Sequence, residues 1–152
     1  MKYWLINFEE EQYWIEVTDE NIALRQLIKA KDVVKISCIE DCLAEGPVDI
    51  IELDGEVHEI SMEEFEKVWS DETKPYRKHW EIQKEKYQIG DIVQGKIKFF
   101  YPQGIILQIG ETKGVFVDMR DDNKNSIYPL DTIKGMVKGY DDKNMWIIIS
   151  SM

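Results

Sequence analysis

The sequence predicts a mostly β chain of the α+β class, built from two modules. Short runs rich in aromatic and β-branched residues recur along its 152 residues, as is typical of strands. A helical spacing of apolar residues is clear in one segment only. The formal net charge of -11 is also uneven, since residues 90–152 hold eight basic and eight acidic side chains. All the excess acid therefore lies in residues 1–89, which predicts two modules with different surfaces.

The first module begins with two predicted strands, over 2–8 (KYWLINF) and 12–18 (QYWIEVT), with a turn between them. The segment 23–37 allows either two strands around a turn at Lys29–Asp32 or a helix followed by a strand. The β-branched residues Val33, Val34 and Ile36 favour two strands. Gly46-Pro47 then predicts another turn. The first module is thus expected to contain an antiparallel sheet.

The clearest helix is predicted in ISMEEFEKVW, which ends at Trp69. Ser61 and Glu64 have the S-x-x-E spacing of a capping box. Phe65, Val68 and Trp69 then fall on one face, which is expected to pack against the sheet. The polar stretch that follows allows a second helix with Pro75 in its first turn. We therefore expect an acidic α+β domain over 1–72, a linker or helix over 73–88, and a further domain over 89–152.

The second module contains five predicted strands, over 91–100, 104–110, 113–117, 133–140 and 145–150. A polar loop over 118–132 separates the third strand from the fourth. Alternation in the first strand directs Val93, Ile97 and Phe99 inward and Lys96 and Lys98 outward. Five short strands with one long connection are the plan of a five-stranded Greek-key barrel, the OB-fold.

This half of the chain resembles the ribosomal S1 RNA-binding domain over about 63 residues. The family opens with G-D-x-V-x-G-x-V, has a glycine at the start of the second strand and another leading the third, and closes with a strand, an acidic turn and an apolar strand. The matching residues are Gly90, Asp91, Val93, Gly95, Ile97, Gly104 and Gly114, followed by 136–140, 141–144 and 146–150. The resemblance implies a barrel that binds RNA.

Three positions depart from the family where it usually contacts RNA. Gln103 stands where an aromatic residue commonly precedes the second-strand glycine, and Ile106 stands where another aromatic residue follows it. Val117 replaces a histidine that is common late in the third strand. The resemblance therefore implies the family's framework with fewer of its contact residues.

Binding of single-stranded nucleic acid needs positive charge together with flat aromatic surfaces. In the barrel these groups are Lys96, Lys98, Phe100, Tyr101, Lys113, Phe116 and Lys138. Asp141 and Asp142 in the last hairpin are expected to repel phosphate. The resulting prediction is weak, nonspecific binding of single-stranded RNA by a small, bacterial-type accessory protein.

An alternative prediction is a protein-interaction module, in which the acidic N-terminal domain docks a basic protein and the barrel binds no nucleic acid. The chain has none of the common nucleotide-binding, metalloprotease or serine-hydrolase motifs, so we expect no enzyme activity. Cys38, Cys42, His58 and His79 lack zinc-site spacing, so neither a metal nor a cofactor is expected. The sequence shows no signal peptide and no apolar run long enough for a membrane span, which predicts a cytoplasmic protein without a membrane partner.

Overall fold

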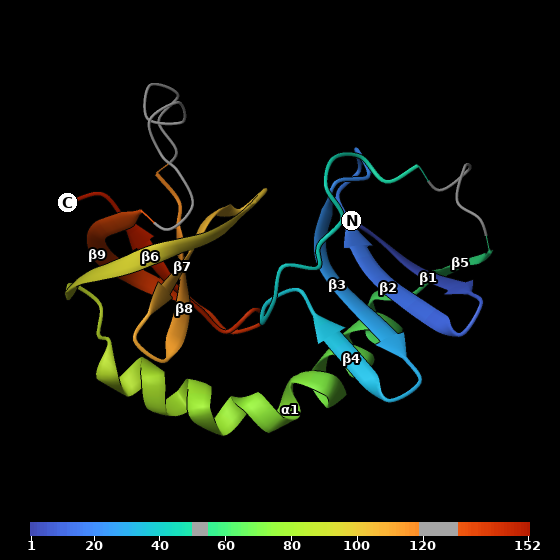
Figure 1. The fold of residues 1–152 in the computed structure, drawn as a ribbon, viewed down its shortest axis with the longest axis horizontal. Helices are drawn as coiled ribbons and strands as arrows, with labels where there is room; N and C mark the ends of the chain where they lie inside the picture. Colours follow the sequence, from blue (N-terminus) through green and yellow to red (C-terminus); the bar gives the residue numbers. More distant parts are fainter. Residues whose placement is uncertain (50–54, 119–130) are drawn as a thin grey trace. The chain divides into compact units, whose positions relative to one another are not determined.

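The computed structural model describes residues 1–49, 55–118 and 131–152 (Figure 1). The chain divides into two compact units, Met1–Pro75 and Tyr76–Met152, hereafter unit 1 and unit 2. Each unit contains five strands, and the one described helix runs through the division. This confirms the predicted mostly β fold. No helix in the described ranges combines the length and apolar character that a membrane span requires.

Unit 1 is built on an antiparallel sheet with the strand order β4-β3-β2-β1-β5 (Figure 1). Its strands are β1 (Lys2–Phe8), β2 (Glu11–Val17), β3 (Ala23–Ala30), β4 (Val33–Ile36) and β5 (Glu56–Ile60). The two-strand interpretation of 23–37 is therefore confirmed. Strand β5 was not predicted, because its sequence EVHEI is polar and it lies at an edge of the sheet, where little apolar surface is buried.

Helix α1 (Met62–Lys86) begins as predicted, with its first turns packed on the sheet. The Glu64 N–H donates to Ser61 Oγ at 3.1 Å, which is the N-cap bond of the predicted capping box, and the Ser61 hydroxyl donates to Glu64 Oε1 at 3.3 Å. Phe65 and Trp69 are fully buried, and the Phe65 ring lies 5.2 Å from the Tyr3 ring on β1. The apolar stripe of the helix is thus part of the core of unit 1.

The expectation of a separate second helix starting at Pro75 is wrong, because α1 continues through Pro75 to Lys86. Proline has no N–H and cannot bond to the carbonyl four residues earlier, a defect that costs about 3 kcal/mol. The helix is nevertheless anchored on both sides of this defect. Trp69 is buried before Pro75, and Trp80 and Gln83 are buried after it. Tertiary packing therefore outweighs the local signal.

Unit 2 contains a closed five-stranded barrel with the order β10-β8-β7-β6-β9, in which β9 also pairs with β10. Its strands are β6 (Ile92–Tyr101), β7 (Gly104–Ile109), β8 (Thr112–Phe116), β9 (Thr132–Asp141) and β10 (Trp146–Ser150). All neighbours are antiparallel except β8 and β10, which are parallel. The predicted barrel is confirmed, and most of the predicted long loop lies outside the described residues.

The predicted alternation of buried and exposed side chains holds along β6. Val93 and Ile97 are buried, and Lys96 and Lys98 are exposed. The pairing with β7 shifts between Ile97 and Phe99, which makes Lys98 the extra residue of a β-bulge. Phe99, expected in the core, is only half-buried, whereas Tyr101, two residues further on, is buried.

Candidate nucleic-acid interface

The structure aligns two of the predicted lysines across three neighbouring strands. Lys96 on β6 pairs with Gln108 on β7, and Gln108 pairs with Lys113 on β8. Side chains at paired positions stand on the same side of a sheet, about 5 Å apart at their Cβ atoms. Gln108 is held in place, since its Nε2 donates to the carbonyls of Gly110 and Thr112 at 2.8 and 2.9 Å. The row Lys96–Gln108–Lys113, hereafter the lysine row, forms a polar strip on the barrel.

Two more predicted contact residues are exposed further along β6. Lys98 follows Lys96 by two residues and is exposed at the bulge. Phe100 is 45% exposed and pairs with Ile105 at the end of the β6–β7 hairpin. It is therefore an aromatic residue with a surface available to a base. The lysine row with Lys98 and Phe100 forms the candidate interface.

The other two predicted aromatic contacts are core residues. Tyr101 is 7% exposed, and its ring centroid lies 4.7 Å from that of Phe99 and 6.1 Å from that of Trp146. Phe116 is 8% exposed. Neither ring presents a face on which a base can stack. Both residues pack in unit 2, and the candidate interface leaves them out.

Lys138 is exposed but lies outside the strip formed by β6, β7 and β8. Met136 on β9 pairs with Ile92, so Lys138, two residues further on, lies beyond the start of β6. Lys98 lies six residues from Ile92 in the other direction. Lys98 and Lys138 are therefore separated by eight strand positions, which corresponds to about 26 Å of extended chain. Sequence reasoning missed the nearer Lys134, which pairs with β6 at Gln94, two residues before Lys96.

The acidic hairpin after β9 is occupied by contacts within unit 2. The Asp142 carboxylate accepts hydrogen bonds from Lys84 Nζ at 2.8 Å and from Trp80 Nε1 at 2.9 Å. The hydrogen bond from Lys84, followed by that from Trp80, lowers the pKa of Asp142. Asp141 accepts hydrogen bonds from the backbone and side-chain amides of Asn144. The expected repulsion of phosphate is therefore partly neutralised by Lys84, which the sequence pattern did not associate with this turn.

The positions that depart from the S1 pattern differ in their surroundings. Ile106 is completely buried, Gln103 is half-buried and Val117 is 43% exposed. None of them supplies an aromatic face or a charged donor. Phe100 is thus the exposed aromatic side chain of the candidate interface within the described residues.

The division into units sharpens the charge asymmetry. Unit 1 has seven basic and twenty acidic residues, a net charge of -13, whereas unit 2 has twelve basic and ten acidic residues, a net charge of +2. The difference from the sequence-based division arises because Arg77, Lys78, Lys84 and Lys86 belong to the barrel unit. The candidate interface therefore lies on the unit whose charge is favourable for a polyanion.

Elsewhere, the described residues hold no group of three metal-ligating side chains. Cys38 is buried and Cys42 is half-buried, and burial raises the pKa of the Cys42 thiol to about 12. At neutral pH this thiol is protonated, which makes it a poor nucleophile. Neither a protein-family model nor a curated protein matches the chain.

Proposed function

We propose that unit 2 is an OB-type, S1-like module that binds single-stranded RNA weakly and with little sequence preference. The observation that carries this proposal is the alignment of Lys96, Gln108 and Lys113 across β6, β7 and β8. Lys98 and Phe100 are exposed residues of the same β6–β7 hairpin. The lysines supply charge to phosphates, and Phe100 supplies a surface for one base.

The composition of the interface sets the expected strength of binding. A stacked base contributes about 1–3 kcal/mol, and one exposed aromatic residue provides one such contact. Three lysines that neutralise three phosphates give a slope of about -2 in a plot of log K against log salt concentration. Lysine makes a point-charge contact and does not read a base edge. The proposed binding is therefore weak, sensitive to salt and tolerant of sequence.

The test uses the full chain and a labelled single-stranded RNA, titrated at about 50 and 200 mM salt, where each phosphate contact has a measurable effect. The double substitution Lys96→Gln/Lys113→Gln is expected to make the salt slope shallower by about 1.4. Phe100→Leu is expected to weaken binding by about fivefold or more, because stacking is lost. The full chain is used because α1 connects the two units.

The matched control is Lys31→Gln/Lys67→Gln, which removes the same charge from exposed positions in unit 1. It is expected to leave the salt slope unchanged. Equal effects of the two double variants would mean that RNA responds to net charge alone, and would reject the lysine row as the interface. Absence of binding by the full chain at low salt would reject the RNA proposal itself.

A second candidate function is supported by the charge of -13 on unit 1. A surface of this charge attracts basic proteins and accelerates their association. In that case a lysine- and arginine-rich peptide would bind the full chain in a salt-dependent manner, with resonance shifts in unit 1. The Lys96→Gln/Lys113→Gln variant would bind this peptide as the unmodified chain does.

A further inference from the structure

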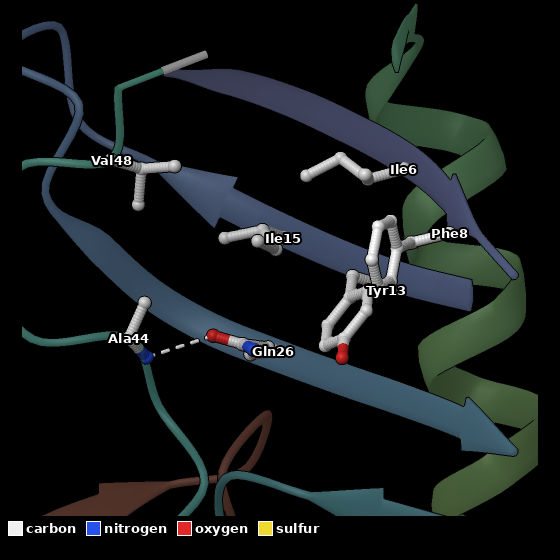
Figure 2. A pocket seen from close by; sticks show the side chains of 7 residues that line it. All are labelled: Ile6, Phe8, Tyr13, Ile15, Gln26, Ala44 and Val48. Carbon is white, nitrogen blue, oxygen red and sulfur yellow. Dashed lines mark hydrogen bonds between the residues drawn. The ribbon is translucent and has the colours of Figure 1, made fainter. Parts of the chain in front are cut away.

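Unit 1 has a sheet with two different faces (Figure 2). One face, which carries Tyr3, Glu16 and Arg25, is turned toward α1. Tyr3 packs on Phe65 of the helix, and Arg25 bonds both to Glu66 of the helix and to Glu16. Neighbouring residues in a strand point to opposite faces. Ile15 directly precedes Glu16, and Gln26 directly follows Arg25, so both side chains point away from the helix. Figure 2 shows them rising from the other face of the sheet.

An apolar pocket occupies this second face. Its volume is about 320 Å³. Its walls come from β1, β2, β3 and the segment after β4, and they consist of Ile6, Phe8, Tyr13, Ile15, Gln26, Ala44 and Val48. Small-molecule sites are commonly of about 300–1,000 Å³, mostly apolar, with a few fixed polar groups. The pocket meets this description in both size and chemistry.

Gln26 is the polar group of the pocket, and its orientation is fixed. It is 4% exposed, and its backbone N–H donates to Ser37 Oγ at 2.9 Å. Its side-chain Oε1 accepts the Ala44 N–H at 2.8 Å. The other end of the amide, Nε2, must then point away from Ala44, and Figure 2 shows it on the side of Tyr13. No residue in the described parts of the chain accepts a hydrogen bond from this Nε2.

Gln26 Nε2 is thus a donor that no described residue engages, and a ligand with an acceptor in the pocket would form a hydrogen bond with it. The surroundings limit the kind of acceptor. Unit 1 has a net charge of -13, and the Tyr13 hydroxyl at the pocket donates to the Glu11 carboxylate. An anionic ligand would meet this negative field, whereas an uncharged one would not. The rest of such a ligand must be apolar, because the other walls of the pocket are mostly apolar.

We propose that this pocket binds a small, uncharged, mostly apolar molecule whose carbonyl oxygen accepts a hydrogen bond from Gln26 Nε2. The site is independent of RNA binding, because every lining residue belongs to unit 1 and the lysine row belongs to unit 2. Gln26 would fix the orientation of the carbonyl group, and Ile6, Ile15 and Val48 would cover the apolar part. The site therefore adds a ligand function to the acidic half of the chain.

Two probes of similar shape test the proposal on the full chain, namely acetophenone, which has a carbonyl group, and cumene, which has a methyl group in its place. Binding is followed by chemical shifts of the Gln26 side-chain amide and of the Ala44 and Val48 backbone amides. Gln26→Leu is expected to weaken acetophenone binding by about three- to tenfold, the value of one hydrogen bond. Cumene binding should not weaken, because cumene accepts no hydrogen bond.

Cumene also reports whether a variant keeps its pocket. Gln26→Met is the second variant, because methionine has a similar length and no donor. A variant that still binds cumene but has lost the preference for acetophenone supports the proposal. Unchanged acetophenone affinity in a variant that binds cumene overturns it. Failure of both probes to shift the pocket resonances of the unmodified chain also overturns it.

Discussion

The two units each bury one side of a five-stranded sheet, but they do so with different interactions. In unit 1 the open sheet encloses a buried ion cluster against α1, and the buried charged residues of the described chain, Glu16 and Arg25, both lie there. In unit 2 the closed barrel encloses apolar side chains such as Ile97, Leu107 and Ile149. The comparison suggests that unit 1 depends on charge pairing and unit 2 on close packing.

The ion cluster of unit 1 is fully paired. Arg25 donates from Nε and Nη2 to the two carboxylate oxygens of Glu16 at 2.9 and 2.8 Å, and it also bonds to Glu66 on α1. Its guanidinium carbon lies 4.9 Å from the Phe65 ring centroid and 5.0 Å from that of Trp69. Burial lowers the pKa of Arg25, but the bonds to Glu16 and Glu66 outweigh it and the net pKa is raised. Arg25 therefore stays charged and links the sheet to the helix.

The barrel of unit 2 has glycine at positions where neighbouring strands leave no room for a side chain, such as Gly135 and Gly114. A Cβ on Gly135 would lie 2.5 Å from Ile149 Cγ2 and 2.6 Å from the Ser150 carbonyl oxygen. A Cβ on Gly114 would lie 2.7 Å from Cδ1 of both Ile109 and Ile149. These distances are shorter than any tolerated contact, so glycine is required by space alone. Packing of this kind leaves little room for polar groups.

The largest expected effect is that of Arg25→Ala on unit 1. The substitution leaves Glu16 buried without its partner, which is expected to lower the free energy of unfolding by about 3–5 kcal/mol. Chemical denaturation followed by tryptophan fluorescence measures the loss, and amide exchange assigns it to unit 1. Lys67→Ala is the control, because it breaks an exposed ion pair with Asp71 and should cost less than about 1 kcal/mol. A similar small loss for Arg25→Ala would contradict the dependence of unit 1 on charge pairing.

A smaller effect, confined to unit 2, is expected for Gly135→Ala. The added methyl group must displace the β10 backbone at Ser150, which is expected to cost about 1–3 kcal/mol. Gly139→Ala is the matched control on the same strand, since the nearest atom to its Cβ would be Ile148 Cδ1 at 4.0 Å. Thermal unfolding of both variants measures the difference. Equal stability of the two would show that the barrel adjusts easily and is not limited by packing.

The smallest effect concerns the ion pair between Asp142 and Lys84 in unit 2. The pKa of Asp142 is lowered in the folded state, so its contribution is present above the unfolded pKa of about 3.8 and is lost as the pH falls through the lower folded value. The side chain is 65% exposed, which limits this contribution to about 1 kcal/mol. Asp142→Asn is expected to remove that part of the acid dependence, as measured by unfolding at about pH 2 to 5, a range that extends below the usual aspartate pKa.

Asp71→Asn serves as the control for this pH series, because Asp71 pairs with Lys67 in unit 1. Its effect on the unfolding of unit 2 should be negligible. An Asp142→Asn variant with an unchanged acid limb would show that the contacts of Lys84 and Trp80 add nothing measurable to unit 2. The barrel would then depend on packing alone, and the contrast between the units would be sharper still.

Local sequence patterns were sufficient for much of the fold. Aromatic and β-branched residues in KYWLINF and QYWIEVT identified β1 and β2, β-branched residues identified β4, and Ser61 with Glu64 identified the start of α1. Five strand-like runs with their turns also predicted the barrel. These features depend on neighbours within a few residues, so the information for them lies in short segments.

The tertiary structure alone decided the features that depend on strand register and on distant partners. Lys96 and Lys113 became neighbours through Gln108, whereas Tyr101 and Phe116 were assigned to the interface from sequence and are buried in unit 2. No local signal predicted that α1 continues through Pro75, or that Gln26 Oε1 is bonded to Ala44 while Nε2 has no acceptor among the described residues. The physical reason is that strand pairing and burial depend on segments far apart in the sequence. The bulge at Lys98 shifts the pairing of β6 with β7, and the burial of Trp80 holds α1 in place beyond Pro75.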